Sequence, residues 1–111
     1  MNNRVSLLGR VVGAPVYHCT TEARDLLRFS LRVVDAYHPD SFFPQECVIW
    51  GGPALGLAAC LQSGDCVLVR GALRYRRESS RRPYVEIRRY VLLGCVAGKA
   101  VTLADAYEHT E

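Results

Sequence analysis

Leu27-Arg28-Phe29-Ser30-Leu31-Arg32-Val33 alternates strictly between apolar and polar residues. A period of two predicts a β-strand, because successive side chains of a strand point to opposite faces. The apolar residues of this stretch are therefore expected on a buried face. Arg28, Ser30 and Arg32 share the opposite face, which is open to solvent or to a ligand.

The same period extends over most of the chain. Further strands are predicted at residues 5–12, 45–50, 65–76 and 83–93, and Gly13-Ala14-Pro15 marks the end of the first strand. A polar connection over 18–25 and a loop over 36–44 flank the second strand. Residues 53–62 predict a short helix, because this segment opens with proline, lacks β-branched residues and is closed by Gly64.

This order of elements predicts an all-β fold, a five-stranded OB-fold barrel with one short helix between the third and fourth strands. The barrel domain is expected over residues 1–94, and a C-terminal tail over 95–111, with its degree of order left open. An all-β domain with an incidental helix is the structural alternative. At 111 residues the chain is long enough to bury one core by itself.

The basic residues are unevenly distributed, although the formal net charge is only +3. Thirteen of the fourteen basic residues are arginines, and eight of these lie between Arg70 and Arg89. Only Glu78 and Glu86 oppose them in that window. Such a region suits an anionic polymer. The alternative is that these arginines form only a solvated face.

The five cysteines are odd in number, widely spaced and mostly set inside apolar runs. This usage predicts reduced thiols that act as small core residues in a cytoplasmic protein. The spacing of His18, Cys19, Cys60 and Cys66 matches no zinc site, so neither a metal nor any other cofactor is predicted.

No catalytic residues are predicted, and the chain is not expected to be an enzyme. Gly51 and Gly52 precede the predicted helix, but no Gly-Lys-Ser/Thr follows, as a phosphate-binding loop requires. None of the three histidines stands in a recognisable nucleophile–base signature. The sequence shows no signal-peptide pattern and no apolar run long enough to span a membrane, so no membrane partner is expected.

Four segments, taken in order, resemble the bacterial single-stranded DNA-binding protein family. They are Asn3-Arg4-Val5-Ser6-Leu7-Leu8-Gly9-Arg10, the alternating stretch 27–33, Cys47-Val48-Ile49-Trp50-Gly51, and the run from Gly64 to Arg74. The match in order and spacing extends from Asn3 to Val91. The resemblance implies an OB-fold that coats unpaired DNA without sequence preference in replication, recombination or repair.

Binding of single strands needs cationic groups for phosphates and aromatic faces for bases. The resemblance places Tyr37 and Trp50 at stacking positions, although a lone tryptophan is also often a core or interface residue. On the fifth strand, Tyr84, Arg88 and Tyr90 are expected to share a face. Arg24, in the connection before the second strand, is expected to contribute less. The predicted nucleic-acid-binding residues are Arg10, Arg28, Arg32, Tyr37, Trp50, Arg74, Arg76, Arg81, Arg82, Tyr84 and Arg88.

The chain also departs from the family pattern. Replicative members carry a long linker with an acidic tip that recruits other proteins, and the run that ends at Glu111 has no such linker. Thr21-Glu22-Ala23 stands where the family has a glycine. An adaptor like the related primosomal replication protein, acting mainly through contacts with replication or primosome proteins, is therefore the alternative function. Both functions imply a homodimer or homotetramer, since the first strand is apolar on nearly both faces.

Overall fold

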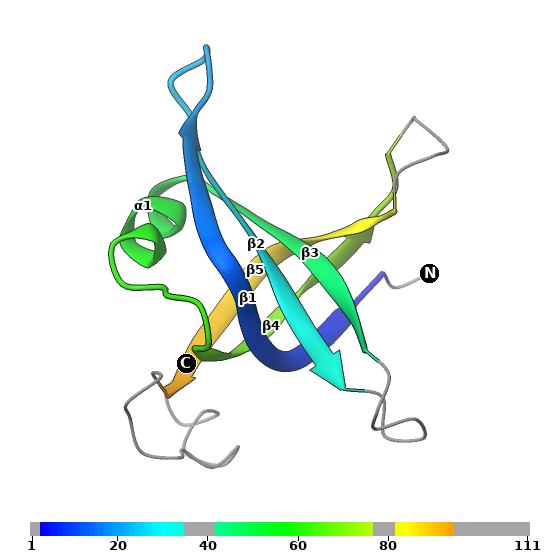
Figure 1. Cartoon of the computed structure of the whole chain (residues 1–111). Helices are drawn as coiled ribbons and strands as arrows, with labels where there is room; N and C mark the ends of the chain where they lie inside the picture. The colour runs from blue at the N-terminus through cyan, green and yellow to red at the C-terminus, as the bar shows by residue number, and fades with distance from the viewer. Residues whose placement is uncertain (1–2, 35–41, 77–81, 95–111) are drawn as a thin grey trace.

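The computed structural model describes residues 3–34, 42–76 and 82–94. Its elements are β1 (Val5–Cys19), β2 (Asp25–Val34), β3 (Phe42–Trp50), α1 (Gly52–Ala58), β4 (Cys66–Arg74) and β5 (Tyr84–Gly94). The strands form a closed barrel in the order β1-β2-β3-β5-β4 (Figure 1). All neighbours are antiparallel except β3 and β5, which are parallel. The predicted five-stranded barrel with a helix between the third and fourth strands is confirmed.

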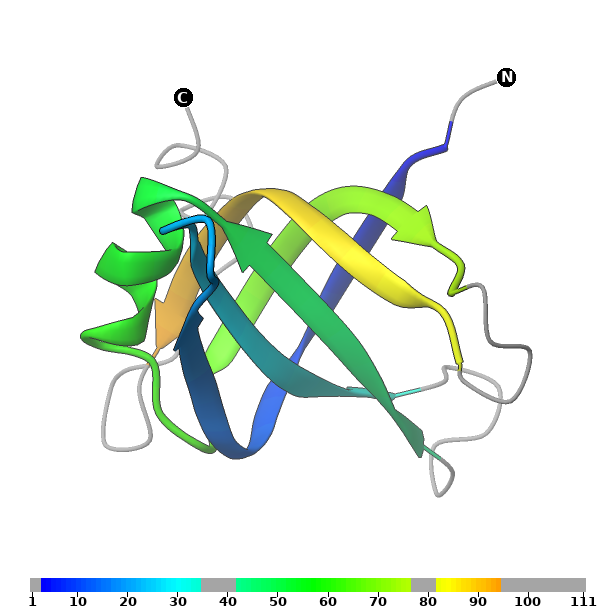
Figure 2. The same cartoon turned by 90° about the horizontal axis from the view of Figure 1, so that it is seen from above.

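The alternating stretch behaves as its period predicts. Leu27, Phe29 and Leu31 are at most 4% exposed and lie in the core, whereas Arg28 and Arg32 are exposed on the outside of β2. The helix α1 lies at one end of the barrel in both views (Figures 1 and 2). Its apolar side adds Ala54 and Leu57 to the core cluster. No helix in the described ranges is long and apolar enough to cross a membrane.

The first strand is longer than predicted. β1 pairs with β4 through Val5–Arg10 and then with β2 through Arg10–Cys19, with a break in register between Val12 and Val16. Gly13-Ala14-Pro15 therefore marks an irregularity inside one bent strand, because glycine and proline accompany bulges as well as turns. The strand ends instead at the turn over Thr20–Arg24, where the amide of Ala23 donates to the carbonyl of Thr20 at 2.9 Å.

Two other boundaries also differ from the prediction. Residues 42–44, expected in a loop, begin β3 and pair with residues 32–34 of β2. The helix ends at Ala58 and not at Gln62. The other strand ends agree within two residues. The side chain of Asn3 extends the barrel beyond β1, since its amide group both donates to the carbonyl of Leu73 and accepts from that residue's N–H.

Two glycines of the family pattern stand where strands approach too closely for a side chain. A Cβ on Gly9 would lie 2.5 Å from the carbonyl oxygen of Arg32. A Cβ on Gly71 would lie 1.9 Å from the carbonyl oxygen of Glu86, which is far inside van der Waals contact. The backbone of the closed barrel therefore requires glycine at both positions.

A bulge in β5 overturns the face predicted for its aromatic residues. Arg70 is paired with Arg89, but the next residue, Gly71, is paired with Ile87, so Arg88 is an extra residue. Beyond this bulge the side chains change sides, and Tyr90 packs against the core cluster. The prediction that Tyr90 shares the outer face with Tyr84 is therefore wrong.

The cysteines only partly match their predicted role as core residues. Cys47 is buried, and burial, with a smaller effect of the Glu46 charge, raises its pKa to about 12. Cys19 and Cys60 are exposed, because they lie on outward-facing positions of a hairpin and of the segment after α1. The described cysteines are free thiols, and Cys95 lies outside the described residues. No described group of three or more His, Cys, Asp and Glu residues is arranged to hold a metal ion.

Candidate nucleic-acid interface

Aromatic side chains surround a hollow on the outside of β2, β3 and the end of β4. We call it the aromatic hollow, and it is lined by Leu26, Arg28, Val48, Trp50, Tyr75, Arg76 and Tyr84. Val48 faces outward beside Arg28, yet only 4% of it is exposed, because neighbouring side chains surround it. It supplies an apolar floor. Tyr75, whose orientation the sequence left open, is 77% exposed and faces out.

Backbone contacts at the end of β3 fix Trp50. Trp50 is paired with Leu26, and the N–H of Gly51 donates to the carbonyl of Asp25 at 2.9 Å. The carboxylate of Asp25 in turn accepts a hydrogen bond from the hydroxyl of Tyr17 across the hairpin. This hydrogen bond raises the pKa of Tyr17 to about 12, because loss of the phenol proton would leave two negative oxygens facing each other. Trp50 therefore lies beside the end of the β1–β2 hairpin, whose two strands are joined by the Tyr17–Asp25 hydrogen bond.

Arg24 lies on the indole ring of Trp50. Its guanidinium carbon is 4.5 Å from the ring centroid, which is a cation–π distance. Arg24 was expected to contribute less than the strand arginines, and the structure places it directly on the predicted stacking residue. Sequence periodicity could not find this contact, because Arg24 belongs to a turn and the contact depends on the register between β2 and β3.

Arg76 contacts three groups, and one of them is the ring of Tyr84. It donates to the carboxylate of Glu46 at 2.6 Å and to the carbonyl of Arg82 at 2.8 Å. Its guanidinium carbon also lies 4.8 Å from the ring centroid of Tyr84. Arg76 thus joins the start of β5 to β3 and supports the Tyr84 ring from one side. Neither Glu46 nor this positioning role was apparent from the sequence.

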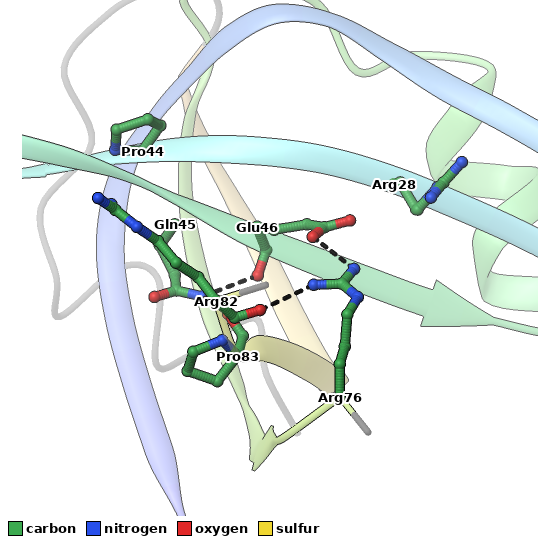
Figure 3. A pocket seen from close by; sticks show the side chains of 7 residues that line it. All are labelled: Arg28, Pro44, Gln45, Glu46, Arg76, Arg82 and Pro83. Carbon is green, nitrogen blue, oxygen red and sulfur yellow. Dashed lines mark hydrogen bonds and ion pairs between the residues drawn. The ribbon is translucent and has the colours of Figure 1, made fainter. Parts of the chain in front are cut away.

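A second hollow adjoins the first and shares Arg28 and Arg76 with it. We call it the arginine hollow, and it is lined by Arg28, Pro44, Gln45, Glu46, Arg76, Arg82 and Pro83. Figure 3 shows the guanidinium groups of Arg28 and Arg82 toward opposite ends of this hollow, with Arg76 between them. In the described part of the chain, the Arg28 side chain has no hydrogen-bond or ion-pair partner. Arg28 is therefore available to an anion at the junction of the two hollows.

The other predicted arginines have different surroundings. Arg74 is paired in register with Tyr84 and forms an ion pair with Glu86 at 3.3 Å. Arg32 lies farther along β2, opposite Pro44 and Arg10. Arg10 donates to the carbonyl of Gly64 at 2.9 Å, which ties β1 to the loop before β4.

The structure thus brings together five of the predicted residues, namely Arg28, Trp50, Arg76, Arg82 and Tyr84, around the two hollows. Arg88 lies elsewhere, in a hollow with Arg4 and Arg89. Tyr37 and Arg81 lie outside the described residues. Glu46, which lines the arginine hollow, is in an ion pair with Arg76, and Glu86 is in an ion pair with Arg74.

Two solved structures resemble this barrel. A deletion mutant of the single-stranded DNA binding protein from Thermus aquaticus aligns with a TM-score of 0.70 and 25% identity, covering 82% of this chain and 40% of that one. The chain thus corresponds to less than half of the Thermus chain. An SSB domain from Synechococcus sp. aligns with a TM-score of 0.67 and 21% identity, covering 81% of this chain and 94% of that domain.

Comparison with curated protein sequences gives no significant match. The sequence pattern of the single-strand binding protein family, in contrast, matches residues 2–93. This range includes β1 to β4 and all of β5 except its last residue, Gly94. The glycines at the close approaches of the barrel and the Trp50-Gly51 step fall within that match. The chain belongs to the single-strand binding protein family.

Proposed function

We propose that the protein binds single-stranded DNA without sequence preference and coats it during replication, recombination or repair. Bases stack in the aromatic hollow, and phosphates lie along the arginine hollow. The observation that carries this proposal is the cluster of Trp50, Tyr75 and Tyr84 around an apolar floor. Beside it lies the guanidinium of Arg28, which has no hydrogen-bond or ion-pair partner among the described residues. Membership of the single-strand binding protein family supports it.

The chemistry of these hollows favours unpaired strands. A base exposes its flat face only when it is unpaired, and each base stacked on an aromatic side chain contributes about 1–3 kcal/mol. Every base has such a face, so stacking discriminates little between sequences. The planar guanidinium of Arg28 suits two-pronged contact with a phosphate and also stacks on bases.

Tryptophan fluorescence tests this proposal, because Trp50 is the only tryptophan. We expect titration with oligo-dT to quench the emission to saturation, and duplex DNA of the same length to bind more weakly. The matched control is Leu55→Ala, at an exposed residue of α1 that lines neither hollow. Oligo-dT binding no tighter than duplex binding would overturn the proposal and favour the primosomal-type adaptor.

We also propose that the protein forms a homodimer or homotetramer through β1. Residues 5–9 pair with β4 on one edge, while β2 begins its pairing only at Arg10, so the other edge has no partner strand among the described residues. Leu8 and Val12 are 41% and 43% exposed on this strand. An open edge with apolar side chains suits pairing with a second copy. Light scattering should give at least twice the monomer mass, and a monomer at micromolar concentration would contradict this.

Three further expectations follow from this function. The protein acts by binding and not by catalysis, and it acts in the cytoplasm, where reduced thiols such as those of Cys19 and Cys60 persist. Replication or primosome proteins are its expected protein partners. Pull-down with the purified protein, with and without oligo-dT, distinguishes direct partners from proteins that only share the DNA.

A further inference from the structure

Tyr17 and Asp25, whose side chains join the two strands of the β1–β2 hairpin, line neither of the two hollows. Figure 1 shows this hairpin projecting beyond the barrel. Two paired strands alone give a projecting hairpin little stability in water. The same hairpin nevertheless carries Arg24, whose guanidinium carbon lies 4.5 Å from the ring centroid of Trp50. The contacts that keep Arg24 in this place therefore matter for the interface.

The Tyr17–Asp25 hydrogen bond lies on the face of the hairpin that is turned away from Trp50. Tyr17 is paired with the core residue Leu27, and Asp25 precedes Leu27 by two residues, so their side chains share one face. Trp50 is paired with Leu26, whose side chain is on the other face. Tyr17 and Asp25 are diagonal neighbours on facing strands, a separation that a long aromatic side chain can bridge.

Asp25 connects three strands directly after Arg24 in the chain. It begins β2, and its carboxylate accepts the hydroxyl of Tyr17 from β1. Its carbonyl accepts the N–H of Gly51 at 2.9 Å, and Gly51 directly follows Trp50 at the end of β3. The distance between Arg24 and the indole is therefore set through Asp25.

The turn holds Arg24 from its other side. The N–H of Thr20 donates to the carbonyl of Arg24 at 2.9 Å, and the N–H of Arg24 donates to Oγ1 of Thr20 at 3.2 Å. The backbone of Arg24 is thus fixed both by the turn and by the residue that follows it. A cation held in this way needs little further ordering when a ligand binds beside it.

We propose that Tyr17 and Asp25 are positioning residues for base stacking: their hydrogen bond holds Arg24 against one face of the Trp50 indole before any strand binds. A base then stacks on the opposite face of the ring. The bond acts from the reverse side of the hairpin and through Arg24, without contact with the DNA. This inference rests on the proposed function for the stacked base, whereas the placement of Arg24 is a property of the free protein.

Acrylamide quenching of the only tryptophan tests the placement of Arg24 without DNA. Tyr17→Phe removes the hydroxyl and keeps the ring, and Arg24→Ala removes the cation that covers the indole. Both variants should have a larger quenching constant than the parent, because acrylamide gains access to the covered face of the ring. The double variant Tyr17→Phe/Arg24→Ala should match Arg24→Ala, because Tyr17 acts through Arg24.

Titration of the same four proteins with oligo-dT tests the effect on stacking. The affinity of Tyr17→Phe should fall by no more than that of Arg24→Ala, about two- to five-fold for an exposed cation–π contact. The two losses should not add in the double variant, because residues that act through one another are not additive.

Three further substitutions control for effects on the hairpin as a whole. Asp25→Asn keeps an oxygen that can accept the hydroxyl of Tyr17, so quenching and affinity should stay close to those of the parent. Asp25→Ala should behave like Tyr17→Phe. Cys19→Ala, at an exposed residue on the same strand and face as Tyr17, should change neither measurement.

Urea denaturation distinguishes positioning from a merely structural role. If the Tyr17 hydroxyl only stabilised the hairpin, Tyr17→Phe would lower the free energy of unfolding but leave the quenching constant and the affinity of the folded protein unchanged. That result would overturn the inference.

Two other outcomes separate this inference from the proposed function. Additive losses of affinity in the double variant would also overturn it, because Tyr17 would then act independently of Arg24. A parent that does not bind oligo-dT would contradict the proposed function, while the quenching constants would still decide whether Tyr17 positions Arg24.

Discussion

Arg28 and Arg76 both point outward at the aromatic hollow, but their guanidinium groups have different surroundings. Arg76 is engaged by Glu46, by the carbonyl of Arg82 and by the ring of Tyr84. Arg28 has no such partner in the described chain. We infer that Arg28 contacts phosphate directly, whereas Arg76 positions Tyr84. The alternation of a strand predicts only that both arginines face outward. It cannot distinguish their roles, because the partners of Arg76 lie on other parts of the chain.

Substitution of Arg24 tests the role of its contact with Trp50. Arg24→Ala removes the cation that covers one face of the indole. Because an exposed cation–π contact contributes about 0.5–1 kcal/mol, the affinity for oligo-dT should fall two- to five-fold. Fluorescence titration measures it, with Arg24→Lys as the charge-preserving control. Equal affinity of all three proteins would show that Arg24 does not support stacking.

Ala23 occupies a backbone conformation that favours glycine. Its φ is 58°, in the left-handed region, at the turn where the family pattern has a glycine. Ala23→Gly should raise the free energy of unfolding by about 0.5–1 kcal/mol, because the strain of a left-handed alanine exceeds the added freedom of glycine in the unfolded chain.

The matched control for this change is Ala14→Gly, at an exposed position of β1 without a positive φ. Glycine there should lower the free energy of unfolding, because it only adds freedom to the unfolded chain. Urea denaturation of the three proteins gives both values. If both substitutions lower the stability, the turn does not strain Ala23.

At the scale of single elements, the period-two pattern predicted the existence of all five strands and the buried face of β2 correctly. The face that carries Leu27, Phe29 and Leu31 is buried as expected. The errors lie where a strand bends. The sequence Gly13-Ala14-Pro15 is typical both of a turn that ends a strand and of a bulge inside one. Only the pairing of β1 with β4 and then with β2 shows that it is an irregularity within one strand. The position of Tyr90 could not be predicted either, because the bulge beside Arg88 reverses the alternation.

The candidate site was predictable in its residue types but not in its grouping. Outward parity identified Arg28 and Tyr84, and the resemblance identified Trp50. The contact of Arg24 with Trp50 and the separation of Arg88 both depend on the register between strands, which the sequence of one strand does not determine.

Gly71 tests the packing of β4 against β5. In Gly71→Ala the new methyl group would lie 1.9 Å from the carbonyl oxygen of Glu86, so the backbone must move. We expect the free energy of unfolding to fall by about 1–3 kcal/mol, as for an overpacked core. Gly56→Ala is the control, since nothing lies within 4 Å of its Cβ position and Gly56 is in α1. There alanine should stabilise the helix by about 1 kcal/mol, and equal effects of the two substitutions would contradict the packing argument.

At the scale of the whole molecule, the closed barrel gives its two sides different chemistry. The outside of β2 and β3 combines aromatic rings with arginines that are partly neutralised by Glu46 and Glu86. The outside of β1, β4 and β5 carries a hollow whose lining includes Arg4, Arg70, Arg88 and Arg89. The net charge of +3 conceals this distribution, because acidic residues elsewhere offset the arginines.

The salt dependence of oligo-dT binding, followed by Trp50 fluorescence in the parent and in Arg28→Ala, examines stacking and phosphate contact in one titration. Stacking on Trp50 predicts quenching at saturation in both proteins. Phosphate contact by Arg28 predicts a slope of log affinity against log salt that is shallower in the variant by about 0.7. Binding without quenching, or the same slope in both proteins, would contradict the interface described for the two hollows.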